Sequence, residues 1–244
     1  MKVMQQSPAL RAAFQQQINA KKSTKHQEIH GKLGNGFLSG LGSFMYEFNQ
    51  ATNKVKGNIG EWGVSLILQS FPDTWVIFNN ALIPTNSGSL TEIDHLIIGN
   101  GGIFLVEVKT WKGSFSAYKD KWKRREGNNW VAVSNSPTSQ SMYHQKMFNQ
   151  WITSLMPNLP DELVAAPVVF PVAQWIGAKE CSVPVLQGVS ALLQMIASSP
   201  TCLTTTQVQA IAEAVVLLEL PVKITPVPKP MPKPKPVKRQ NPTS

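Results

Sequence analysis

Two apolar segments joined by a two-residue turn constrain the fold of this chain more than any other feature. Residues 91–98 and 103–109 are rich in Val, Ile and Leu, and Asn100-Gly101 lies between them. An Asn-Gly pair favours a type I′ turn, because both of its central residues tolerate positive φ. The sequence therefore predicts a β-hairpin in which Asp94 faces Glu107 and Glu92 faces Lys109.

Side chains alternate along a strand, so these four charged residues project from one face of the predicted hairpin. The opposite face carries Ile93, Ile97, Phe104, Val106 and Val108. Carboxylates that face each other repel unless a positive charge lies between them. Their oxygens are ligands suited to Mg²⁺, with Lys109 able to hold a phosphate or a water. A plain salt bridge between Glu92 and Lys109 is the alternative.

The remaining hydrophobic patterns predict a mixed α/β domain around this hairpin. A helix is expected to begin near Asn58, because the residues after it recur at helical spacing. A second, amphipathic helix is expected over residues 138–155, with Gln140 and His144 near one face. The other expected elements are strands over 74–83, 113–118, 129–133 and 164–172 and a helix over 205–220.

Positive charge is concentrated near the two ends of the chain. The formal net charge is +9, with eight Lys/Arg against two Glu in residues 1–60 and six Lys/Arg against no acidic residue in 221–244. Residues 61–220 hold nine Lys/Arg against twelve Asp/Glu. Basic arms are suited to a polyanion.

The composition divides the chain into three parts. Residues 1–56 are expected to be a polar, basic N-terminal extension with a helix near 8–21, residues 57–220 the folded domain, and residues 221–244 a disordered tail of alternating Pro and Lys. The tail is suited to phosphates or to a partner's aromatic groove, and equally to a purely solubilising role.

Cellular location is indicated by what the sequence lacks. It has only Cys181 and Cys202, no uninterrupted apolar run long enough for a membrane span, and no secretory pattern at its start. We therefore expect a cytoplasmic protein with reduced thiols and no membrane partner.

Three segments resemble the nuclease-related domain, NERD, a family placed in the PD-(D/E)xK nuclease superfamily. They are GNIGEWG at 57–63, TEIDHLIIGNGGIFLVEVKTWKG at 91–113 and NSPTSQSMYH at 135–144, and the similarity is strongest within 57–150. The resemblance implies a restriction-endonuclease-like core, in which a mixed β-sheet is flanked by helices. Two positions depart from related nucleases: Ile93 stands before Asp94 in place of Pro, and His144 stands where Tyr is frequent.

The resemblance also implies roles for individual residues. Asp94 and Glu107 would be the metal ligands, assisted by Glu61 from a helix, and Lys109 would be the catalytic lysine. Gln140 would match the glutamine that begins the helix after the sheet. Glu61 has an alternative role, since Asn58 and Glu61 have the spacing of a helix capping box.

Three further groups of residues were considered for function. The basic stretch Lys119, Lys121, Trp122, Lys123, Arg124 and Arg125 is suited to phosphate contact with base stacking, or it is a solvated hairpin loop. His95 points to the apolar face, which favours a hydrogen-bonded core histidine. His144 is undecided between the site and a buried contact.

Two functions follow as expectations. The first is a nuclease dependent on Mg²⁺ or Mn²⁺ that hydrolyses phosphodiester bonds of DNA or RNA, with DNA as the first choice of substrate, in bacterial DNA processing. The second is a catalytically inactive nucleic-acid-binding module of a DNA-processing or transfer complex. Fold alone does not decide between them, because one fold serves many functions.

Overall fold

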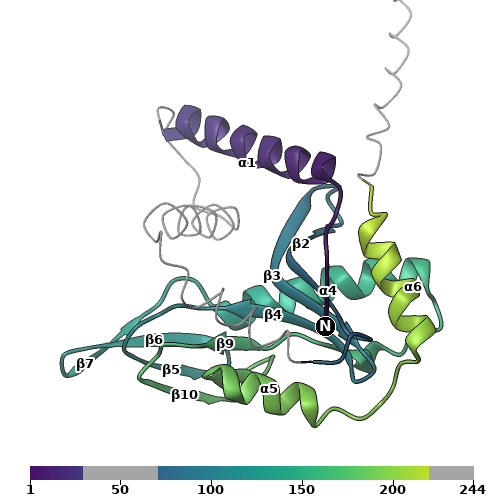
Figure 1. The fold of residues 1–244 in the computed structure, drawn as a ribbon. Coiled ribbons are helices and arrows are strands. Elements are labelled where there is room, and N and C mark those ends of the chain that lie inside the picture. The colour runs from purple at the N-terminus through teal and green to yellow at the C-terminus, as the bar shows by residue number, and fades with distance from the viewer. Residues whose placement is uncertain (30–70, 220–244) are drawn as a thin grey trace, which may run out of the picture.

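The computed structural model describes residues 1–29 and 71–219, which form a mixed α/β structure (Figure 1). The main sheet has the strand order β1-β2-β3-β4-β9-β11, with β8 pairing to β4. Its strands are β1 (Lys2–Met4), β2 (Val76–Pro84), β3 (Leu90–Gly99), β4 (Gly102–Val108), β8 (Val164–Ala165), β9 (Val168–Phe170) and β11 (Val185–Gln187). The β2–β3 and β3–β4 pairs are antiparallel and the other pairs are parallel, so the predicted mixed sheet is confirmed.

The predicted hairpin is present in the predicted register, but the expectation of a type I′ turn is wrong, because positive φ occurs at Gly102 and not at Asn100 or Gly101. Gly99 pairs with Gly102 across the Asn100-Gly101 turn, and the ladder runs through Leu96 and Leu105 to His95 and Val106. Continuing this register by one residue puts Asp94 and Glu107 at the end where the strands separate. Every residue of β4 is buried, as expected of a hairpin covered on both faces.

Helices cover both faces of the main sheet. One core joins the sheet to α4 (Pro137–Leu155) and α6 (Thr205–Val216), through residues such as Leu105, Phe148 and Ile211. A second core joins the opposite face to α5 (Val189–Ala197), through Phe104 and Leu192. Figure 1 shows α5 in front of the sheet and α4 behind it. The face that carries Asp94 and Glu107 is therefore the α4 face.

A second sheet of four strands extends from the main one. Its order is β10-β5-β6-β7, formed by β5 (Ser114–Tyr118), β6 (Lys121–Glu126), β7 (Asn129–Ala132) and β10 (Trp175–Lys179). One face packs on the main core through Phe115, Ala117 and Trp122. Residues 119–125 are therefore a tight turn followed by a strand, and the expectation of a solvated hairpin loop there is wrong.

The first 29 residues take part in this structure. Strand β1 adds to the edge of the main sheet beside β2, and helix α1 (Pro8–Ile29) buries Leu10, Phe14 and Ile18 against the β2–β3 region. The backbone of Leu82 exchanges two hydrogen bonds with the Gln6 side chain, at 2.7 and 2.8 Å. These glutamine contacts explain part of the Gln-rich composition. The division of the chain at residues 56 and 220 stays a prediction.

Other parts of the prediction differ in detail. The strand expected over 164–172 is split by Pro167 into β8 and β9, since proline lacks the N–H that a ladder needs. The short 3-10 helix η1 (Asp161–Leu163) precedes β8. The helix expected over 205–220 ends at Val216. The helix expected after Asn58 and the tail from residue 221 lie outside the described residues.

Candidate active site

Glu107 lies at the centre of a buried polar cluster between the main sheet and α4. Its backbone N–H donates to Pro167 O at 3.0 Å, and its Cα partner on β9 is Val168. The residue is 3% exposed, in a strand of otherwise apolar side chains. A buried carboxylate needs polar partners to offset its lost hydration.

Lys109 and Gln140 supply those partners to one carboxylate oxygen. The Lys109 ammonium donates to Glu107 Oε1 at 2.7 Å, and the Gln140 amide donates to the same oxygen at 2.8 Å. Lys109 also donates to Gln140 Oε1 at 3.1 Å, which closes a triangle of three side chains. The first turn of α4 thus brings Gln140 to Glu107 and Lys109, from which it is 33 and 31 residues away in sequence.

The first turn of α4 is fixed by its cap. Ser136 accepts a hydrogen bond from the Ser139 N–H at 3.1 Å, and Pro137 occupies the first helical turn, where its missing N–H costs nothing. Ser141 anchors the next turn by donating to Ala166 O at 2.7 Å. The position of Gln140 is therefore determined by the local sequence of the helix start.

Asp94 reaches the same end of the hairpin from β3. It is 8% exposed, and its Oδ2 accepts the backbone N–H of Val108 at 2.7 Å. This hydrogen bond ties the aspartate to the strand that carries Glu107. Glu92, by contrast, pairs with Arg11 of α1, while Lys109 pairs with Glu107.

His144 belongs to this cluster, which resolves its undecided assignment. Its Nδ1 lies 3.6 Å from Glu107 Oε2, and its Nε2 is 3.1 Å from Thr91 Oγ1. Burial lowers the pKa of His144, while the nearby Glu107 charge acts to raise it. In the neutral tautomer with the proton on Nδ1, this N–H points toward Glu107, and Nε2 accepts a hydrogen bond from the Thr91 hydroxyl. This tautomer is therefore favoured.

The second oxygen of Glu107 suggests a position for a cation. Glu107 Oε2 is buried and has no hydrogen-bond partner, although an unmatched buried carboxylate oxygen is costly. Asp94 and Glu107 offer hard oxygen ligands, which fit Mg²⁺ or Mn²⁺. In the described part of the chain no group of three or more His, Cys, Asp or Glu is arranged to hold a metal. Glu61, the predicted third carboxylate, lies outside that part.

The predicted nucleic-acid-binding stretch is divided between surface and core. Lys119, Lys121, Lys123, Arg124 and Arg125 are exposed. Trp122 is only 2% exposed, and its indole N–H donates to Thr138 at 3.0 Å. A ring held in this way presents no face to a base, so the expectation that Trp122 stacks on nucleic acid is wrong.

His95 behaves as a structural residue, as its strand position predicted. It is buried, and its Nδ1 lies 2.8 Å from Asn79 Oδ1. Burial lowers its pKa to about 4, against a smaller opposing effect of Glu107. The ring is therefore neutral at pH 7.

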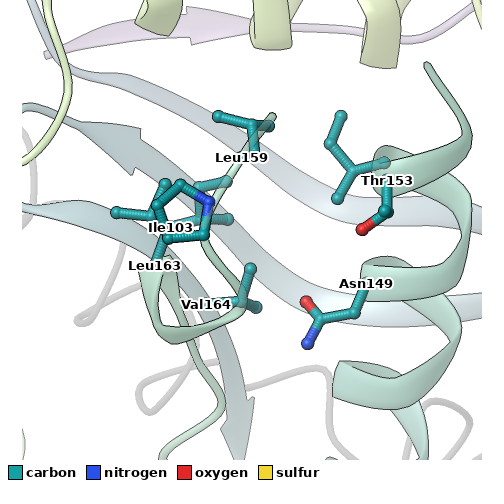
Figure 2. A pocket seen from close by; sticks show the side chains of 8 residues that line it. Ile103, Asn149, Thr153, Leu159, Leu163 and Val164 are labelled. Carbon is teal, nitrogen blue, oxygen red and sulfur yellow. The ribbon is translucent and has the colours of Figure 1, made fainter. Parts of the chain in front are cut away.

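A small pocket lies at the other end of α4, away from this cluster (Figure 2). Asn149 is its notable polar residue, because its buried Oδ1 has no hydrogen-bond partner. The pocket contains none of the predicted site residues. Its lining is Ile103, Asn149, Ile152, Thr153, Leu159, Pro160, Leu163 and Val164.

Sequence reasoning missed Thr91 as the partner of His144. The strand prediction did place Thr91 at the open end of the hairpin, but only the packing of α4 on β3 brings the two side chains together.

No helix in the described ranges 1–29 and 71–219 has the length and apolar character to span a bilayer.

Comparison with known proteins agrees with this geometry. The family model of the nuclease-related domain matches residues 56–171. The probable kinase PglW of Streptomyces coelicolor is 34% identical over 62 residues, which cover 25% of this chain and 4% of that protein. An uncharacterized protein of Bacillus anthracis is 36% identical over 61 residues, covering 25% of this chain and 29% of that protein.

Both similarities are local, since the chain spans less than a third of either relative. No solved structure matches the chain significantly. The family match nevertheless covers the hairpin, the second sheet as far as β7, and α4, which together carry the cluster around Glu107. Residues 56–171 of this chain therefore belong to the nuclease-related domain family and form a domain of the PD-(D/E)xK-like type.

Proposed function

We propose that this protein is a metal-dependent nuclease that hydrolyses phosphodiester bonds of DNA or RNA. The observation that carries the proposal is the state of the Glu107 carboxylate. One oxygen is held by Lys109 and Gln140, and the other is buried with no partner at hydrogen-bond distance, the nearest polar group given for it being His144 Nδ1 at 3.6 Å. A stability role alone gives no reason for this arrangement, because an apolar residue of similar size avoids the cost of burying the charge.

Asp94 and Glu107 are the proposed ligands of Mg²⁺ or Mn²⁺, with Glu61 as a further carboxylate. When bound, such an ion supplies Lewis acidity and lowers the pKa of a coordinated water. The chain's own residues prepare the site before that. The Val108 N–H fixes Asp94, and Gln140 fixes both Glu107 and Lys109.

Lys109 is the proposed catalytic residue. Its ammonium is a point charge with three donors, suited to orienting a water or to offsetting charge on a phosphate oxygen in the transition state. Gln140 is a positioning residue that restricts where the ammonium lies. His144, neutral and anchored by Thr91, lies 3.6 Å from Glu107 Oε2 and adds no second cation there.

The wider setting is proposed on the same basis. Nuclease-related domains suggest association with nucleic acid, and DNA is the partner we propose first, in bacterial DNA processing within the cytoplasm. A protein partner for the Pro/Lys-rich segment 221–244 is proposed from its composition. The alternative, an inactive nucleic-acid-binding module, retains the same fold and charges, and the following experiment separates the two.

The purified protein is incubated with linear, circular and single-stranded DNA and with RNA, each in Mg²⁺, Mn²⁺ or EDTA. Asp94→Asn serves as the matched variant, because it keeps the size of the side chain and removes its charge. We expect cleavage by the wild type with a metal ion only, and a loss of at least about 100-fold in Asp94→Asn.

Two outcomes contradict the nuclease proposal. Cleavage that persists in EDTA contradicts metal dependence. The absence of cleavage of every substrate, with nucleic-acid binding retained, supports the inactive binding module instead.

A further inference from the structure

The outer face of the second sheet combines exposed aromatic rings with positive charge. The sheet's inner face packs on the core, and its outer face is formed by the alternate residues of each strand. Three large aromatic residues on that outer face are well exposed: Tyr118 at 52%, Trp130 at 40% and Trp175 at 49%. Exposed rings of this size are costly on a surface without a partner.

The strand register places these residues in three adjoining rows. In the first, Trp175 pairs with Ser114, and Arg125 pairs with Trp130. In the second, Lys123 lies in a row whose other members are small, namely Gly177, Ser116 and Ala132. In the third, Tyr118 lies between Lys179 and Lys121. We call these three rows the aromatic platform.

The small residues leave room for the rings to lie across the sheet. A Cβ at Gly177 would be 2.1 Å from the ring of Trp175, so the indole lies directly over that glycine. The Trp130 and Trp175 ring centroids are 6.1 Å apart, with an angle of 56° between their planes. Both rings are thus held near one another, each with part of its surface open to solvent.

All charged side chains in the three rows are positive: Lys121, Lys123, Arg125 and Lys179. The acidic residue of β6, Glu126, follows the opposite alternation and is bonded to Arg124. The platform therefore has a cationic field around exposed rings, which complements a polyanion whose bases are free to stack.

We propose that the aromatic platform binds single-stranded nucleic acid, with bases stacking on Trp130, Trp175 and Tyr118 and with Lys121, Lys123, Arg125 and Lys179 contacting phosphates. A duplex hides the faces of its bases, so exposed rings add nothing to its binding, whereas a single strand offers them. The platform goes beyond the proposed cleavage site, because none of its residues belongs to the cluster around Glu107.

The chain connects the two regions closely. Lys109 and Ser114 are separated by residues 110–113, so their Cα atoms are at most about 18 Å apart, given 3.3–3.6 Å per residue. A strand lying on β5 therefore comes near the end of β4 that carries Lys109. The platform gives the proposed nuclease a preference for unpaired nucleic acid.

The test measures binding of the full chain in EDTA by fluorescence anisotropy. The probes are a fluorescein-labelled oligo(dT), an oligo(U), an abasic strand of equal length, a duplex of equal length and a polyglutamate peptide. We expect the wild type to prefer oligo(dT) and oligo(U) to the abasic strand and the duplex. Replacing Trp130 or Trp175 by Ala should weaken oligo(dT) binding by about 5- to 150-fold for each stacked base lost.

Matched variants distinguish rings from charge. Lys123→Gln with Arg125→Gln should lower the slope of log K against log salt by about 0.7 per lost phosphate contact. Lys146→Gln, which neutralises an exposed lysine of α4 outside the platform, should leave that slope unchanged. Gly177→Ala keeps every ring but displaces the Trp175 indole, and should also weaken oligo(dT) binding several-fold.

Three results overturn the inference. The first is that the Trp130→Ala/Trp175→Ala variant binds oligo(dT) as tightly as the wild type. The second is that the wild type binds the abasic strand as tightly as oligo(dT). The third is that it binds polyglutamate as tightly as oligo(dT), which identifies an acidic protein as the partner. A melting curve for each variant establishes that it is folded. Because EDTA prevents metal-dependent cleavage, the binding result does not depend on whether the protein is a nuclease. If the protein cleaves nucleic acid but the platform does not bind it, this inference is overturned and the nuclease proposal stands.

Discussion

Gln140 connects the side chain of Glu107 on β4 with that of Lys109, the residue after this strand. Its amide donates to Glu107 and accepts from Lys109, at 2.8 and 3.1 Å. The prediction that these three residues act together came from a family resemblance and could not have come from spacing alone, because α4 and β4 are far apart in sequence. The role of each in catalysis stays a prediction.

Gln140→Ala should lower kcat by about 10- to 100-fold with little change in KM, since the Lys109 ammonium loses the Gln140 oxygen as a hydrogen-bond acceptor. The measurement is steady-state cleavage with Mg²⁺ across a range of pH. Met142→Ala, an exposed change on the same helix, is the control and should behave as the wild type. An unchanged kcat in Gln140→Ala would contradict a positioning role.

His95 provides a stability prediction at the same scale. Burial lowers its pKa to about 4 in the folded protein, from an ordinary value of 6.5. Between these values the unfolded chain binds a proton that the folded chain does not. The free energy of unfolding should therefore fall as pH drops from 6.5 toward 4, by at most about 3 kcal/mol from this residue.

Urea unfolding at several pH values measures this dependence. His95→Leu should show a shallower loss between pH 6.5 and 4, even if it is less stable at pH 7 through its lost bond to Asn79. His144 contributes in the same direction, because burial lowers its pKa too. An identical slope in wild type and His95→Leu would show that His95 is not buried and neutral.

At the scale of elements, the register of the β3–β4 hairpin was predictable, and strands were expected where β5 and β7 lie, but the pairing of the second sheet was not predictable. The position of the Asn100-Gly101 turn and the alternation of the two strands gave the register, although the turn type differs from the expected one, since positive φ occurs at Gly102. Strands β10 and β11 join by parallel pairing to distant strands, and helix α5 is short. Parallel pairing between distant strands leaves no local pattern, so the contact between Trp130 and Trp175 was beyond sequence reasoning.

The turn of the hairpin can be tested by Gly102→Ala. Gly102 has φ of +124°, and a Cβ there would be 2.9 Å from the Leu163 carbonyl oxygen. We expect a loss of about 1–3 kcal/mol in the free energy of unfolding, from strain and from the close contact.

Gly88→Ala is the matched control, because Gly88 also has positive φ, +71°, but open space around its Cα. It should lose only the conformational part, about 1 kcal/mol. Thermal and urea unfolding measure both variants. Equal losses in the two would mean that Leu163 does not pack against the turn.

At the scale of the whole molecule, the hydrophobic patterns predicted a mixed α/β class and the charge distribution predicted basic ends, and the class is confirmed. It did not reveal that residues 1–29 add a strand and a packed helix to the domain, since α1 is polar overall and its apolar residues form a narrow stripe. Contacts such as that between Gln6 and Leu82 depend on the tertiary fold.

Removing residues 221–244 tests whether the charge at this end of the chain contacts nucleic acid. The segment holds six Lys/Arg and no acidic residue. If all six contact phosphates, deletion should lower the salt slope of single-strand binding by about 4. Full replacement of these six by Gln should match the deletion. An unchanged slope would assign the segment a solubilising role.

The central claim is that the Glu107 carboxylate serves Mg²⁺-dependent phosphodiester hydrolysis, and Glu107→Gln tests it most directly. This variant keeps the shape of the side chain and removes the charge that Lys109 and the proposed cation share. The measurement is the rate of DNA cleavage by wild type and variant as Mg²⁺ is titrated. The account predicts cleavage that rises with Mg²⁺ in the wild type and is reduced at least about 100-fold in Glu107→Gln. Equal cleavage by the two proteins would contradict it.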